Sequence, residues 1–398
     1  MKISLILLCF LGCASAQDPT ELTRLNKSYE AAVQKAITPL KQTYIQELKK
    51  LKDNYTKAAK LEDAIAVDKV LKELPSSVNS ALTPATVTET VTETVAETVA
   101  VNASEGFVLI PSGSFTMGDE LDGVGDAHRV RVSAFYMAQN LVTKAEWDEV
   151  RTWGLENGYS ELAAGSGKAD NHPVQNISWY QMVKWCNARS QKEGLVPVYY
   201  TDDTQTTIYK TGDVNVTNAQ VKWSANGYRL PTEAEWEKAA RGGKSGKRFP
   251  WGDTISHKQA NYKSASGKAY DLSGAVNSFH PSYTTGGDPF NSPVGSFAAN
   301  GYGLYDMAGN IWQRCWDWYG SYDPSVLTDP RGPVVLMDPR GQAPTGAFRV
   351  RRGGSWGNGA DGCRVAYRDR DDPSNSLNYV GFRVARSSDP STGRPGAK

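Results

Sequence analysis

Residues 301–313 (GYGLYDMAGNIWQ) constrain the possible folds of this 398-residue chain more than any other stretch. Its three glycines permit backbone turns that other residues resist, and the large apolar side chains between them supply bulk for a core. Asp306 and Asn310 add side-chain oxygens, and a turning backbone adds carbonyl oxygens. A compact loop lined with oxygens suits a hard cation such as calcium. The alternative interpretation is a tight buried turn that holds no ion.

The amino-terminal residues 1–16 have the pattern of a signal peptide. Lys2 precedes a short apolar run, and the small residues that follow end at Ala16. Cleavage there predicts an exported protein, whether periplasmic, secreted or at the cell surface. A second interpretation is a lipoprotein anchored through Cys13. The apolar run is too short for a transmembrane helix, and no later run qualifies. The formal net charge of +1 gives no argument for a nucleic-acid partner.

Three further segments lie outside the main domain. Residues 17–75 carry apolar side chains in steps of three and four, which predicts a helical hairpin or short coiled coil. Residues 20–74 could join copies of the chain into a homo-oligomer, or the helices could serve only as a spacer. Residues 76–104 repeat Thr, Val and Glu, and this low complexity predicts a disordered linker. Residues 389–398 form a short tail.

Residues 105–388 are predicted to form one α+β domain with little regular secondary structure. The chain contains 37 Gly and 20 Pro, which is typical of a body rich in loops and turns. Strands are predicted at residues 107–110, 114–117 and 128–136, and helices are predicted to begin after Thr143, Ser178 and Thr232. Thr143 and Thr232 each precede a Glu by three residues, as in a capping box. Gly242 is expected to end the third helix.

Several short motifs occur in series within this domain. They are RLPTEAEWE at residues 229–237, PWGD at 250–253, NGYGLYD at 300–306, GNIW at 309–312, RGGSW at 352–356 and GFR at 381–383. In this order they resemble the formylglycine-generating enzyme family, also called the sulfatase-modifying-factor family. The resemblance covers about residues 105–388 and implies a variant of the C-type-lectin-like fold. It does not by itself imply an activity.

The resemblance also implies calcium as a cofactor, at two sites. In the first site, Asn261 and Asp288 would give side-chain oxygens, and Tyr262 and Phe290 would give carbonyl oxygens. The alternative is that the carboxylate caps a loop without an ion.

The second implied calcium site lies in the loop of residues 301–313. Asp306 would give a carboxylate, and Gly309 and Ile311 would give carbonyl oxygens. The family often has Glu where Gln313 stands. A Gln still offers a carbonyl oxygen but removes one charge, so calcium affinity should fall.

Copper chemistry is the point at which this chain departs from the family pattern. The family's oxidases convert a sulfatase cysteine to formylglycine and hold Cu(I) through two thiolates that follow the Arg-Gly-Gly-Ser motif. Here the segment 353–368 contains only Cys363, and Asn358 stands near the first expected position. Aligning residues 364–368 with the family does not place Cys363 at the second position either. We therefore expect no copper site, with Cys363 as the sole candidate for a catalytic residue.

Iron chemistry of a related branch of the family is not expected either. That branch binds non-haem iron through a His-x-x-x-His-x-His cluster on an added helical domain. The four histidines of this chain are widely spaced and lie in the globular region: His128, His172, His257 and His280.

Cysteine usage leaves the disulfide state open. Removal of residues 1–16 leaves Cys186, Cys315 and Cys363, an odd number that allows at most one internal disulfide. Cys186 lies at helical spacing with apolar residues, which predicts a buried, free thiol. We predict a Cys315–Cys363 disulfide, because each closely follows a core motif. The alternative is three unrelated thiols.

The late segment also offers a binding surface where the family builds its substrate groove. Trp356, Asn358, Asp361 and Arg370 are the candidate binding residues, because Trp, Tyr and Arg are common in recognition surfaces. Internal salt bridges are the expected role of Arg364 and Arg368 instead. The resulting hypothesis is an exported, calcium-stabilised binding or accessory module without copper, whose ligand is a secreted protein, peptide or glycan. The alternative is an active oxidase of a protein cysteine with a rearranged site.

Overall fold

The computed structural model describes residues 106–121, 127–265, 267–274, 278–322, 328–333 and 346–388. The chain divides into two units, residues 1–91 and 92–398, and every described residue belongs to the second. The predicted signal peptide with Cys13, the helical segment, the linker and the tail all lie outside the described residues.

A three-stranded antiparallel sheet joins the start of the domain to its end. Strand β1 (Phe107–Ile110) pairs with β4 (Phe135–Ala138), and β4 pairs on its other side with β9 (Ala385–Ser387). A separate antiparallel hairpin is formed by β2 (Gly113–Met117) and β3 (His128–Val132). The pairing of β9 with β4 brings the carboxyl-terminal Gly-Phe-Arg motif beside the first strands.

A four-stranded sheet forms the second half of the framework. Its buried strand β5 (Trp312–Trp318) lies between β6 (Arg349–Arg352), which is antiparallel to it, and β8 (Val380–Gly381), which is parallel. Strand β7 (Arg368–Asp371) pairs with the far side of β6. The loop of residues 301–313 therefore runs directly into a strand that is buried along its whole length.

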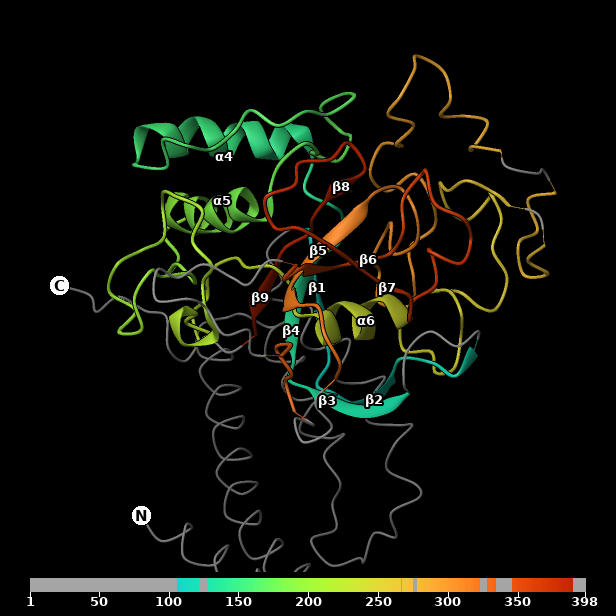
Figure 1. Cartoon of the computed structure of the whole chain (residues 1–398), viewed down its shortest axis with the longest axis horizontal. Coiled ribbons are helices and arrows are strands. Elements are labelled where there is room, and N and C mark those ends of the chain that lie inside the picture. Colours follow the sequence, from blue (N-terminus) through green and yellow to red (C-terminus); the bar gives the residue numbers. More distant parts are fainter. Residues whose placement is uncertain are drawn as a thin grey trace, which may run out of the picture. The chain divides into compact units, whose positions relative to one another are not determined.

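Within the described residues, three α-helices and one short 3-10 helix accompany the sheets (Figure 1). Their bounds are Lys144–Glu156 for α4, Trp179–Lys192 for α5, Asn218–Gln220 for the 3-10 helix η4 and Glu233–Arg241 for α6. The predicted capping boxes at Thr143 and Thr232 are confirmed, as is the cap at Ser178. Gly242 ends α6 in the left-handed region with φ of 55°. These ends were predictable because each cap is a contact within four residues.

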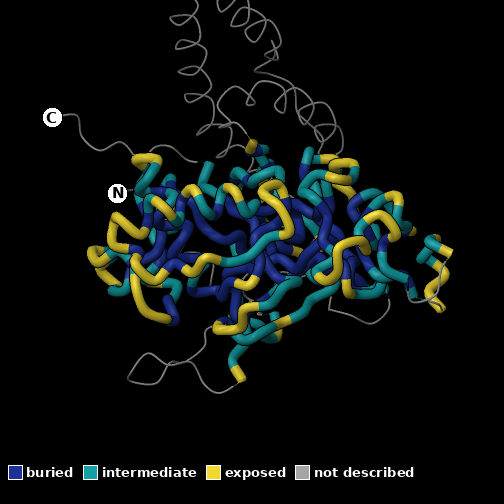
Figure 2. Tube along the Cα trace, turned by 90° about the horizontal axis from the view of Figure 1, so that it is seen from above, coloured by how far each residue is buried: buried dark blue, intermediate teal, exposed yellow. Residues whose placement is uncertain are grey.

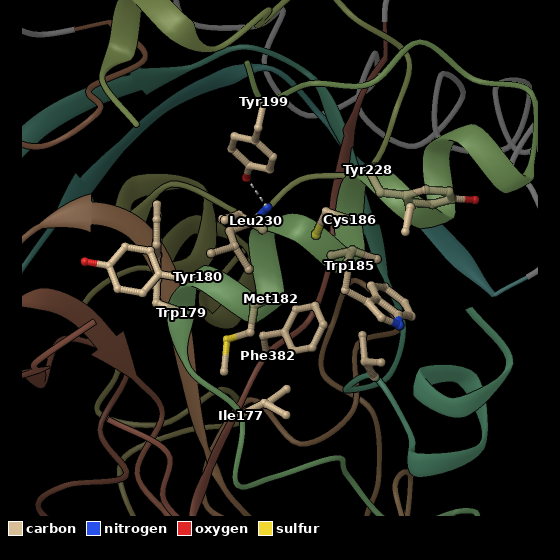
Figure 3. Close-up of a cluster of buried hydrophobic side chains, with 14 of the residues drawn as sticks. Ile177, Trp179, Tyr180, Met182, Trp185, Cys186, Tyr199, Tyr228, Leu230 and Phe382 are labelled. Atoms are coloured by element: carbon tan, nitrogen blue, oxygen red, sulfur yellow. Dashed lines mark hydrogen bonds between the residues drawn. The ribbon is translucent and has the colours of Figure 1, made fainter. Parts of the chain in front are cut away.

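The largest hydrophobic cluster lies where α4 packs on α5. Trp147 and Trp185 stack with ring centroids 5.8 Å apart, and Phe382 meets both rings edge-on. Figure 3 shows Met182, Cys186 and Phe382 gathered around the same interior. Figure 2 shows that buried segments run through the middle of the domain while exposed residues gather on outer loops. Aromatic side chains thus make up much of this core.

The predicted strand over residues 128–136 is wrong as a single element. The chain forms β3 up to Val132 and β4 from Phe135, and the two strands belong to different sheets. Between them, the backbone N–H and the hydroxyl of Ser133 each donate to the Asp329 carboxylate at 2.7 Å. A partner 196 residues away in sequence therefore supports the break.

Candidate functional site

The segment 353–368 is anchored at both ends on helix α6 by buried ion pairs. Arg352, which precedes it, pairs with Glu237 and Glu233. Arg368, which ends it, donates to both Glu233 carboxylate oxygens at 2.6 and 2.8 Å. These pairs confirm the internal role predicted for Arg368. Arg364 also faces inward, 3.8 Å from the Asp119 carboxylate, as predicted.

Cys363 belongs to the core of this segment. Its side chain is buried in a cluster with Phe249, Ile255 and Tyr262 among its members. Burial raises the pKa of the Cys363 thiol, and Asp361 adds to the shift. A Cβ at Gly354 would lie 2.8 Å from the Cys363 Sγ, so the glycine lets the backbone close over the sulfur. A thiol in this environment is poorly suited to the thiolate chemistry of a nucleophile or a Cu(I) ligand.

The predicted disulfide between Cys315 and Cys363 is wrong, because both thiols are free in the structure. Cys315 lies on β5 in the hydrophobic cluster that surrounds α6, whereas Cys363 lies in a different cluster. Cys186 is buried and free on α5, as predicted. Each thiol packs as a small apolar group. Cys315 and Cys363 each follow a motif in the sequence, but this does not place them close together in the fold.

Asn358 occupies the position near which the first copper cysteine was expected. Its side-chain oxygen accepts from the Ser355 hydroxyl at 2.5 Å, and its carbonyl accepts from Lys263 N–H at 2.9 Å. A single buried thiol, Cys363, remains in the segment. This donor set does not fit Cu(I), which favours paired soft thiolates.

The four candidate binding residues do not share one set of contacts. Trp356 is only 8% exposed and packs against Phe279 and Phe290, so it is a core residue. Arg370 is exposed on β7 and lies over the rings of Tyr319 and Phe348. Asn358 and Asp361 are half-buried. The four residues thus differ in burial, from the core position of Trp356 to the exposed position of Arg370.

The residues of the first predicted calcium site include one side-chain oxygen without a hydrogen-bond partner in the part of the chain that the structure describes. The Asn261 side chain is 1% exposed, and its Oδ1 has no hydrogen-bond partner among the described residues. Its Nδ2 donates to the Phe290 carbonyl at 2.8 Å, which brings two of the predicted ligands together. The Tyr262 carbonyl contacts His257 Nε2 at 3.1 Å. A buried amide oxygen beside carbonyl oxygens fits the chemistry of calcium.

Asp288 departs from this arrangement. Its carboxylate oxygens accept from Asn378 Nδ2 at 3.2 and 3.1 Å. Asp288 is exposed, whereas Asn261 is buried. Asn261, Tyr262 and Phe290 are therefore the residues that would hold the ion most directly, and Asp288 would contribute charge from the rim.

In the second predicted site, both oxygens of the Asp306 carboxylate already accept hydrogen bonds. Gly295 N–H and Asn310 Nδ2 donate to the Asp306 carboxylate at 2.8 and 3.3 Å. Burial raises the pKa of Asp306, while the Gly295 hydrogen bond and the Arg383 charge oppose that rise. Gln313 Nε2 donates to the Asp306 carbonyl at 2.7 Å, where the family pattern calls for an oxygen ligand. The side chains of this loop do not fit calcium as arranged, although the backbone turns at Gly309 with φ of 77°.

Arg383 is the residue of this region that sequence reasoning missed. It is fully buried at the end of the Gly-Phe-Arg motif, and its guanidinium lies among loop carbonyls. The available signal was a charged side chain in an otherwise apolar stretch, GFRVA at residues 381–385. A charge in such a stretch must find several acceptors when it is buried.

The described part of the chain contains no group of three or more His, Cys, Asp or Glu side chains placed to hold a metal ion. Within the same residues, no helix has the length and apolar character needed to cross a membrane.

Mixed sheets with few helices, long ordered loops and a late segment anchored on α6 define a domain of the C-type-lectin-like class. Residues 92–388 match the family described as the sulfatase-modifying factor enzyme 1-like domain. The chain belongs to this family.

Several known relatives share most of the domain. A chaperone protein, LppX, of Paenibacillus barcinonensis is 30% identical over 71% of this chain and 90% of its own length. The formylglycine-generating enzyme of Bos taurus is 32% identical over 72% of this chain and 76% of its own. The enzyme of Streptomyces coelicolor is 30% identical over 73% of this chain and 92% of its own.

Solved structures show the same fold. The Treponema denticola variable protein 1 has a TM-score of 0.51 and 27% identity, with 71% of this chain and 94% of that chain covered. CarF has a TM-score of 0.52 and 24% identity, over 71% of this chain and 98% of that chain.

Proposed function

We propose that this chain is an exported, calcium-stabilised binding or accessory module that engages a secreted protein, peptide or glycan without copper chemistry. One observation carries the proposal: Cys363 is a buried core thiol with an amide, Asn358, where a partner thiol would be needed. Two-thiolate chemistry cannot be built from this segment alone.

Calcium supports the long loops in this proposal. Asn261 and Phe290 lie on loops that the structure brings together, and the free Asn261 oxygen supplies a ligand. An ion bound there would fasten residues 261–262 to residues 288–290 without regular secondary structure. The proposed ligands are those of the first site only.

The class of function also has support among the relatives. LppX of Paenibacillus barcinonensis, which matches this chain over 90% of its own length, is named a chaperone protein. A non-oxidising partner-binding role for this chain is in keeping with that name. Export is proposed from the signal-peptide pattern of residues 1–16.

The second candidate function is a protein-cysteine oxidase with a rearranged site. The observation in its favour is that relatives 30–32% identical over most of the domain are formylglycine-generating enzymes. It would require a copper ligand other than a second thiol of segment 353–368.

Cu(I) binding separates the two candidates. Cu(I) would be offered to the folded chain as its bicinchoninate complex, in a background where Cys9 and Cys13 are replaced by serine. We expect the chromophore to keep its copper, because the three remaining thiols are buried. Removal of one equivalent of Cu(I) per chain by the protein, with loss of that binding in Cys363→Ala, would support the oxidase instead.

A further inference from the structure

The orientation of the Gln313 side-chain amide is fixed by two donors. Gln313 Oε1 accepts from Trp236 Nε1 at 2.8 Å and from Arg383 Nε at 2.7 Å. Both partners carry only N–H groups, so the atom that faces them must be the oxygen. The amide nitrogen must then point the other way, and it donates to the Asp306 carbonyl at 2.7 Å.

Arg383 extends this contact to a second part of the chain. One terminal nitrogen of its guanidinium donates to the carbonyls of Ala138 and Gln139 at 2.9 and 3.0 Å, and the other donates to the Tyr305 carbonyl at 2.6 Å. Arg383 is fully buried, and its positive charge lies close enough to oppose the rise in the pKa of Asp306. The guanidinium therefore ties the loop of residues 301–313 to the end of β4.

We propose that Gln313 and Arg383 form a side-chain lock that takes the place of a calcium ion in the loop of residues 301–313. N–H groups of the lock satisfy the carbonyls of Tyr305 and Asp306, which a cation would otherwise attract. The Gln313 oxygen is not available to a cation here, because it already accepts hydrogen bonds from Trp236 and Arg383. The positive charge of Arg383 would also repel the cation. On this proposal the loop is independent of metal, and the residues around Asn261 are where calcium is expected to bind.

Residue 313 decides between the two ways of holding the loop. In Gln313→Glu, one carboxylate oxygen would still accept from Trp236 and Arg383. The other oxygen would face the Asp306 carbonyl, and two acceptors at hydrogen-bond distance repel each other unless a cation lies between them. The substitution should thus create a requirement for calcium that the natural side chain removes.

The test measures calcium stoichiometry by isothermal titration calorimetry and melting temperature in EGTA and in calcium. The full chain would be compared with Gln313→Glu, Asn261→Ala and the double variant. We expect one site in the full chain, none in Asn261→Ala, and one additional site in each protein that carries Gln313→Glu. The melting temperature of Gln313→Glu should rise more on addition of calcium than that of the full chain, because two sites are then filled. Gln313→Met, which removes the hydrogen bonds without adding charge, should be destabilised and should gain no more from calcium than the full chain does.

The lock rests on the proposed function only in assuming a calcium site at Asn261. The lock and the proposed function can therefore fail separately. A full chain that binds no calcium, together with one site in Gln313→Glu, would end the calcium part of the proposed function and support the lock. Retention of one site by Asn261→Ala, or a folded Gln313→Glu that gains none, would overturn the lock. If Gln313→Glu does not fold, the site count of Asn261→Ala decides alone.

Discussion

Glu237 of helix α6 and Arg352 of strand β6 form an ion pair in which both side chains are completely buried. The other oxygen of Glu237 accepts from Gly118 N–H at 2.8 Å and from the Arg241 guanidinium at 2.7 and 3.0 Å. One carboxylate thus joins the first hairpin, α6 and the strand that leads into the segment 353–368. The position of that segment depends on this pair.

Glu237→Gln should be strongly destabilising. The amide cannot neutralise Arg352 and Arg241, and breaking a buried ion pair on one side costs about 3–5 kcal/mol. Chemical denaturation would measure the change in the free energy of unfolding. Glu149→Gln is the matched control, because Glu149 pairs with Lys192 at 2.6 Å but is 68% exposed. That control should cost at most about 1 kcal/mol, and equal effects of the two substitutions would refute the structural role of Glu237.

Gly309→Ala should disrupt the junction of the two predicted calcium loops. Gly309 has φ of 77°, and an added Cβ would lie 2.3 Å from the Asn261 carbonyl oxygen. Gly246→Ala is the matched control, since Gly246 has φ of 65° and an added Cβ there meets nothing within 4 Å. The control should lose about 1–2 kcal/mol from its left-handed backbone alone. Thermal unfolding should show a clearly larger loss for Gly309→Ala, and similar losses would contradict the close approach.

Removal of calcium should lower the melting temperature of the chain. An ion that binds only the folded state stabilises it by about 2.7 kcal/mol at a free concentration 100 times the dissociation constant. Asn261→Ala removes the free side-chain oxygen, so its melting temperature should be the same in EGTA and in calcium. A calcium-dependent shift as large as that of the unchanged protein would place the ion elsewhere.

The free energy of unfolding should also fall as the pH drops through the usual pKa range of histidine. The reason is that burial favours the neutral form of His172. Burial lowers the pKa of His172, with a smaller contribution from the Lys168 charge, although the hydrogen bond to Asn291 opposes the shift. The tautomer follows from the geometry. Asn291 Nδ2 donates to Gln175, so Asn291 Oδ1 faces His172 and accepts a hydrogen bond from its Nδ1–H at 2.8 Å.

The sign of this pH dependence follows from linkage. The unfolded chain binds a proton near pH 6.5, whereas folded His172 binds it only at lower pH, so stability is lost as the pH falls through about 6.5 and below it. His172→Asn keeps an N–H donor near the Nδ1 position and does not titrate. The difference in free energy of unfolding between pH 7 and pH 5 should therefore be smaller in this variant. An identical pH dependence in both proteins would exclude His172 as its source.

Local contacts explain which parts of the fold the sequence predicts. The caps at Thr143, Ser178 and Thr232 depend on neighbours along the chain, and the structure confirms them. The strand at residues 107–110 is also confirmed, although its partner strand β4 is distant in sequence. The break at Ser133 depends on Asp329, and no pattern of nearby residues announces it. The series of motifs was sufficient to predict the family, because the motifs contain core residues from several separate parts of the domain.

The candidate site was harder to predict, because its side chains are defined by distant partners. Trp356 is of a residue type common in binding surfaces, but it is buried and packs against Phe279 and Phe290. Cys315 and Cys363 each follow a motif, yet they face different clusters. From the sequence, Gln313 is predicted to be a weak calcium ligand. In the structure, its side-chain oxygen accepts hydrogen bonds from Trp236 and Arg383 instead. In each case the chemistry depends on orientation, which sequence spacing does not specify.

The central claim is that this domain has kept the family fold without its copper-dependent oxidation. The most direct test incubates the purified chain with Cu(I), oxygen and a peptide that contains Cys-x-Pro-x-Arg, and follows the peptide mass. The formylglycine-generating enzyme of Streptomyces coelicolor, assayed in parallel, serves as the positive control. We predict that the cysteine of the peptide keeps its mass with this chain and is converted by the control. Repeated turnover of the peptide by this chain, abolished in Cys363→Ala, would contradict the claim.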